Sequence, residues 1–95
     1  MKQLTEEKLK KYFAITSRAL KKAKICCPSE THLDKIGKDF YDMASRYFKD
    51  AEHFFSKDDY VNAFGALNYA HGWLDSGARL GIFDVDHDSQ LFTVD

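Results

Sequence analysis

Residues 33–55 carry the most restrictive pattern in this chain, an apolar stripe that recurs at helical spacing. The stripe consists of Leu33, Ile36, Phe40, Tyr41, Met43, Ala44, Tyr47, Phe48, Ala51, Phe54 and Phe55. On a helical wheel these side chains fill an arc of about 160°, and no charged side chain falls inside it. An arc this wide suits a central helix that packs against two neighbours, so the pattern predicts a helical bundle.

Two further helices are predicted, one before and one after this stripe. Thr5 and Thr31 are suitable N-caps for the first and second helices, and Asp34 follows Thr31 in a capping-box arrangement. Asp58 or Asp59 caps the third helix, and the short connection before it makes the last two helices antiparallel. The predicted helices span residues 5–24, 31–57 and 59–80.

We therefore expect one all-α domain over residues 1–95, an antiparallel three-helix bundle with a short extended C-terminal tail at residues 82–95. The tail is expected to be a strap with Phe83 and Phe92 against the bundle, and a loose hairpin is the alternative. The predicted core comprises Phe40, Tyr47, Ala51, Phe54, Phe64, Leu67, Ala70 and Leu74.

Several classes of protein are disfavoured by composition. No apolar run reaches the ~18 residues of a membrane span, and the first seven residues lack the apolar region of a signal peptide. Cys26 and Cys27 are adjacent, so they offer neither a loop-closing disulfide nor the spacing of a metal knuckle. We expect a cytoplasmic protein that does not enter a membrane.

Charge is unevenly distributed along the chain. Residues 1–25 carry a net charge of +6, and the remaining seventy residues carry −7. The first interpretation is that the basic helix complements an acidic body within the same molecule. The alternative is an RNA-associated protein that uses Lys8, Lys11, Arg18 and Lys22, for which nucleic-acid binding should be weak and non-specific.

The third helix carries the best candidate surface. Two glycines, Gly65 and Gly72, lie seven residues apart on its polar side, where each lowers helix stability by about 1 kcal/mol relative to alanine. Such glycines are tolerated where a ligand, a partner helix or the tail approaches the backbone closely. The predicted binding surface comprises Gly65, Asn68, His71, Gly72, Asp75 and Arg79, and its expected ligand is a protein partner or a second copy of the chain.

Catalysis is the weaker interpretation of that surface. His71 and Asp75 are four residues apart, a spacing at which a carboxylate can orient an imidazole for acid–base chemistry. The same spacing also makes an ordinary surface ladder, and no Ser or Cys nucleophile stands beside it. We therefore lean towards a protein that is not an enzyme and assign no catalytic residue.

Two other patterns carry less weight. Asp84, Asp86 and Asp88 have the spacing of a calcium loop, but the turn glycine and the exiting helix are missing, so we predict no metal and no cofactor. Arg46 and His53 have the spacing found in small helical ribonucleases of the HEPN kind, which leaves a ribonuclease-like enzyme as a third interpretation.

The stretch DYVNAFGALNYAHGWLDSGARLGIF, residues 59–83, resembles the archaeal family called domain of unknown function 357. The resemblance is carried by Asp59-Tyr60, Asn62-Ala63, residues 69–75, Gly77 and residues 79–81, and it extends back to about residue 42. It implies a small archaeal cytoplasmic helical protein, and it implies no activity.

Overall fold

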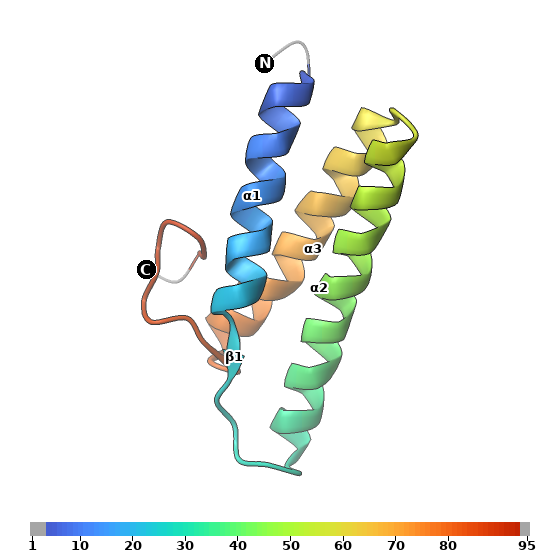
Figure 1. Cartoon of the computed structure of the whole chain (residues 1–95). Helices are drawn as coiled ribbons and strands as arrows, with labels where there is room; N and C mark the ends of the chain where they lie inside the picture. The colour runs from blue at the N-terminus through green and yellow to red at the C-terminus, as the bar shows by residue number, and fades with distance from the viewer. Residues whose placement is uncertain (1–3, 94–95) are drawn as a thin grey trace.

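The computed structural model describes residues 4–93, which form three helices and one short pair of strands (Figure 1). In chain order the elements are α1 (Glu6–Lys22), β1 (Lys24–Ile25), α2 (His32–Ser56), α3 (Tyr60–Leu80) and β2 (Phe83–Asp84). The predicted antiparallel three-helix bundle is confirmed, with helix ends no more than two residues inside the predicted ones. Over these residues, no helix combines the length and apolar character that a membrane crossing requires.

Each helix begins at a predicted cap. The side chains of Thr5, Thr31 and Asp59 accept hydrogen bonds from the backbone N–H three residues later. The carboxylate of Asp34 accepts from the Glu30 N–H at 3.1 Å, one residue before the position expected of a capping box.

A glycine marks the C-terminal end of α3. Gly81 follows α3 with φ +80°, and its N–H donates to the last carbonyls of α3. This is the left-handed conformation in which glycine most often ends a helix.

The helices α2 and α3 form the most extensive pair, while α1 packs mainly on α3 and lies on one side of the α2–α3 hairpin. Aromatic rings make the contacts of α1, with Tyr12 against Phe64 at 5.1 Å between ring centroids and Phe13 against Phe48 at 5.7 Å. The hydroxyl of Tyr41 donates to the Leu20 carbonyl at 2.7 Å.

The core is centred on smaller side chains than predicted. Ala51, Leu67, Ala70 and Leu74 are buried, as expected. The four predicted core aromatics are only half-buried, which corrects that part of the prediction: they are Phe40, Tyr47, Phe54 and Phe64. Alanines at the centre let α2 and α3 approach closely, so the large rings lie at the edges of the contact.

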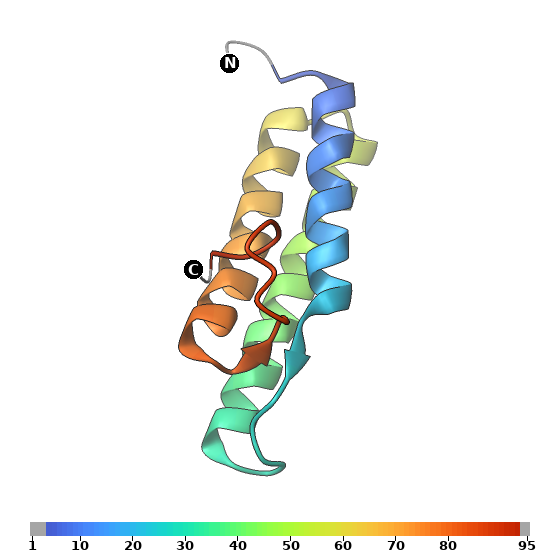
Figure 2. The ribbon, with the colours of Figure 1, turned by 90° about the vertical axis from the view of Figure 1, so that its left-hand side faces the viewer.

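The tail is a strap, not a hairpin (Figure 2). It starts with an antiparallel pairing that was not predicted, in which Ile25 of β1 faces Phe83 of β2. Beyond this pair the tail lies along α1 and α3. Five of its apolar side chains are buried, namely Ile82, Phe83, Val85, Leu91 and Phe92.

Candidate functional site

The predicted binding residues of α3 divide between two sides of the helix. On the side that faces α1 and the tail, Nδ1 of His71 lies 3.2 Å from the Thr16 hydroxyl, and Nε2 contacts the Leu91 carbonyl. Because a carbonyl oxygen only accepts, Nε2 carries a proton and donates it to Leu91, while Nδ1 forms its hydrogen bond with the Thr16 hydroxyl. Both ring nitrogens of His71 are thus used inside the chain.

Asp75 is engaged by the tail in the same way. Its carboxylate accepts from the Thr93 N–H at 3.0 Å and from the Thr93 hydroxyl at 3.4 Å, and Oδ1 lies 3.9 Å from Nε2 of His71. Arg79 is exposed one turn further on, and within residues 4–93 no ion pair joins it to Asp75. The predicted proximity of His71 and Asp75 is therefore present, and its observed role is to fasten the tail.

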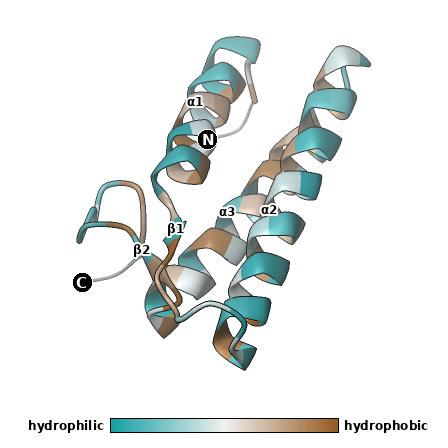
Figure 3. Cartoon of the chain, turned by 60° about the horizontal axis from the view of Figure 1, so that its bottom comes forward, coloured by the Kyte–Doolittle hydropathy of each residue, from teal (hydrophilic) through white to brown (hydrophobic). Residues whose placement is uncertain are grey.

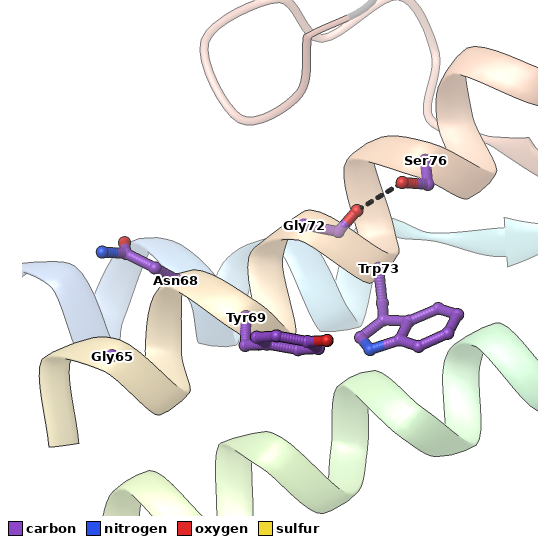
Figure 4. Close-up of a pocket in the computed structure, with 6 residues that line it drawn as sticks. All are labelled: Gly65, Asn68, Tyr69, Gly72, Trp73 and Ser76. Carbon is purple, nitrogen blue, oxygen red and sulfur yellow. Dashed lines mark hydrogen bonds between the residues drawn. The ribbon is translucent and has the colours of Figure 1, made fainter. Parts of the chain in front are cut away.

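Gly65, Asn68 and Gly72 lie together on the outward side of α3. With Tyr69, Trp73 and Ser76 they line a shallow open groove of about 480 Å³ (Figure 4). Within residues 4–93, and apart from the adjoining backbone of α3, a β-carbon built on Gly65 or Gly72 would meet no atom within 4 Å. The described part of the tail, one of the expected reasons for these glycines, does not contact them.

A band of apolar side chains continues from this groove onto α2. Phe40 packs edge-to-face on Trp73 with ring centroids 5.0 Å apart, and Tyr47 lies against Tyr69 at 4.5 Å. None of these rings is fully buried. We call this band the back seam, defined by Ile36, Phe40, Met43, Tyr47, Tyr69, Trp73 and Leu80.

The back seam is uncovered because α1 packs on the opposite side of the hairpin. Tyr41, Phe48 and Phe55 of α2 contact α1, whereas the rings one residue earlier, Phe40 and Tyr47, contact the far edge of α3. Within residues 4–93, Nε1 of Trp73 is buried and has no hydrogen-bond partner.

The outward face of α3 is nearly free of charge. Among its exposed residues only Arg79 is charged, and residues 60–74 contain no Lys, Arg, Asp or Glu. By contrast, every exposed residue of α1 except Ala14 is charged, and most exposed positions of α2 are charged as well. Figure 3 shows the hydrophilic outer side of α2 in teal.

Within residues 4–93, one ion pair joins a basic residue of α1 to an acidic residue of the tail. Lys22 lies 3.7 Å from Asp88, while Lys8, Lys11 and Arg18 are exposed. Lys22, one of the four residues of the predicted RNA-binding face, is thus engaged in an ion pair within the chain.

Two acidic side chains of the tail accept hydrogen bonds from backbone N–H groups of the tail itself. Oδ1 of Asp84 accepts from the Asp86 N–H, and Oδ1 of Asp88 accepts from the N–H groups of Gln90 and Leu91. Among the described residues, no group of three His, Cys, Asp or Glu side chains is arranged to hold a metal ion.

Arg46 and His53 are both exposed on α2. Nε of Arg46 forms an ion pair with Asp42 at 2.9 Å. Such a pairing within one turn of a helix is common on solvated surfaces and needs no active site to explain it.

The Cys27 thiol is poorly suited to act as a nucleophile. Desolvation raises its pKa, and the neighbouring Cys26 and Asp34 raise it further. At neutral pH the thiol therefore stays protonated, and the thiolate is the reactive form.

Comparison with protein families found one match. The model of a family described as protein of unknown function (DUF357) matches residues 11–83, which include all of α2 and α3 and most of α1. Comparisons with curated proteins and with solved structures found no match.

Proposed function

This chain belongs to the DUF357 family of proteins of unknown function, and from its surface we propose that it is a non-enzymatic module that binds a protein partner. The partner packs an α-helix on the outward face of α3 and on the back seam. His71 and Asp75 border this face and form hydrogen bonds with the tail.

The observation that carries the proposal is the empty space at Gly65 and Gly72. Each glycine lowers helix stability by about 1 kcal/mol relative to alanine, and no neighbour in the described part of the chain requires either one. A partner that approaches the backbone of α3 closely would require both, because a methyl group there would hold the two helices apart.

The composition of the surrounding surface supports the same function. Tyr69 is 57% exposed and Leu80 66% exposed, although both are large apolar side chains. Protein interfaces are depleted of charge at their centre and enriched in aromatic residues, as this face is.

Site-specific photo-crosslinking in the native host tests this function. A photo-reactive amino acid in place of Asn68, at the centre of the groove, should form protein adducts in cells. The matched control carries the same amino acid in place of Lys49, on the outer side of α2. Equal adduct yields from the two positions, or none from either, would contradict the proposal.

A second candidate function is RNA association through α1. The exposed cluster of Lys8, Lys11 and Arg18 favours it. It ranks second because a single helix meets few phosphates and the acidic tail opposes the approach of a polyanion.

A further inference from the structure

We infer that the helix bound by α3 belongs to a second copy of this chain, packed antiparallel about a twofold axis between Asn68 and Tyr69. The inference rests on the proposed function and names its partner. It starts from the two glycines on the outward face of α3, Gly65 and Gly72.

In an antiparallel pair with twofold symmetry, each residue faces the residue equally far from the axis on the other copy. Gly65 and Gly72 are equally far from a point midway between Asn68 and Tyr69. Gly65 of each copy therefore faces Gly72 of the other copy, and the two helix backbones come close at both of these contacts. The next pair outward, Val61 and Ser76, is also equidistant from this point, and both of its members are exposed.

This register allows a close and long contact. Residues 61–76 of α3 span about 22 Å along the helix axis. With glycine facing glycine, two helices can pack near the lower limit of about 8 Å between axes. The uncharged stretch from Tyr60 to Leu74 covers most of this length, so few charged groups would lose water in the contact.

Charge complementarity at the two ends favours a second copy over an unrelated protein. Arg79 lies in the last turn of α3 and Asp58 in the loop just before its N-terminus, and both are exposed. Among the ion pairs within residues 4–93, neither side chain takes part. In the symmetric pair, the end of α3 that carries Arg79 lies beside the loop that carries Asp58 of the other copy, so the opposite charges can form an ion pair at each end. A helix crossing angle of about 20° keeps these ends within reach of an arginine side chain.

Sedimentation equilibrium of the purified full chain tests the inference. The wild type should dimerise with a dissociation constant of about 1 μM to 1 mM, the range expected of a small interface. Arg79→Asp alone and Asp58→Lys alone each create two like-charge contacts, and each should weaken dimerisation by about tenfold. Lys49→Asp, a charge reversal on the outer side of α2, is the matched control and should leave dimerisation unchanged.

Mixing the two weakened variants gives the decisive result. In a mixed dimer the two substituted side chains face each other with opposite charges, and the remaining pair is the natural one, so the mixture should dimerise about as well as the wild type. Melting temperatures of both variants confirm that they are folded. A wild type that stays monomeric, or a mixture no stronger than its components, would overturn the inference.

The outcomes separate this inference from the function on which it rests. A monomeric protein whose position 68 still crosslinks to a different protein in cells would retain the proposed function and refute the second copy. A monomeric protein with no adducts from position 68 would refute both.

Discussion

The glycines of the helices differ in what a methyl group would meet. At Gly77 an added β-carbon would overlap the ring of Phe83, and at Gly37 it would overlap the side chain of Ile82. Gly77 and Gly37 therefore make room for the segment that follows α3. At Gly65 and Gly72 an added β-carbon would meet no neighbour among residues 4–93.

This contrast predicts opposite effects of the same substitution. Gly65→Ala/Gly72→Ala should raise the free energy of unfolding by up to about 2 kcal/mol, because alanine is the better helix former. Gly77→Ala should lower it, because the buried ring of Phe83 must shift. Urea denaturation of the three proteins measures both effects. The stabilised double variant should also give fewer protein adducts through position 68. An undiminished yield of adducts would show that the glycines are not needed for binding.

Asp34 predicts part of the pH dependence of folding. Its hydrogen bonds from Lys38 and from the Glu30 N–H lower the pKa of the carboxyl below its ordinary value. A lowered folded-state pKa stabilises the protein above the unfolded-state value of about 3.9, and this stabilisation is lost as pH falls through the folded-state pKa. Asp34→Asn should therefore be less stable than the wild type at pH 7, and the difference should shrink below about pH 3.9. Urea titrations from neutral to acidic pH check this, and a constant difference would contradict it.

At the scale of elements, the tail belongs to the core. Phe92 is 2% exposed, and the same segment supplies the contacts to His71 and Asp75. Phe92→Ala should lower the free energy of unfolding by about 3–5 kcal/mol. The exposed neighbour Gln90 offers a control, since Gln90→Ala should change stability by less than about 0.5 kcal/mol. Similar effects of the two substitutions on chemical denaturation would show that the strap contributes little.

The helices could be predicted because their signals are local. Thr31, Asp59 and Gly81 each mark a helix end through bonds to residues a few positions away. The pairing of β1 with β2 had no such signal, because two-residue strands leave no alternation to detect and their partners are far apart in the sequence. The burial of Phe83 and Phe92 was predicted from their place in the two apolar clusters of the tail, but the sequence did not show which helices they would contact.

The site was predicted in part for the same reason. The exposure of Gly65 and Gly72 follows from helical periodicity, which the sequence displays. The engagement of His71 by Leu91 depends on where the tail runs, which periodicity does not encode. The back seam was missed although the consecutive aromatic pairs of α2 carried a signal for it. Two adjacent rings point to different neighbours, and packing of α2 against two helices also explains an apolar arc this wide.

For the whole molecule, the charge distribution predicts how it meets nucleic acid. The exposed cations of α1 should give weak, non-specific RNA binding, with a dissociation constant of about 10⁻⁴–10⁻⁶ M that rises steeply with salt. Lys11→Glu/Arg18→Glu should abolish it, whereas Lys35→Glu on α2 should reduce it little. Fluorescence anisotropy with single-stranded RNA at about 50 and 200 mM salt measures this. Tight binding that persists at the higher salt concentration would promote RNA association over protein binding.

The pairing of β1 with β2 also affects the order in which the parts of the molecule fold. Lys24 pairs with Asp84, sixty positions later in the chain, so a growing polypeptide must present β1 long before β2 exists. Closing a loop of that length costs more entropy than forming the α2–α3 hairpin across its short turn, so the hairpin should form first. During synthesis the apolar side of α1 therefore stays exposed until α3 and the tail have been made. The core is complete only after the tail has left the ribosome.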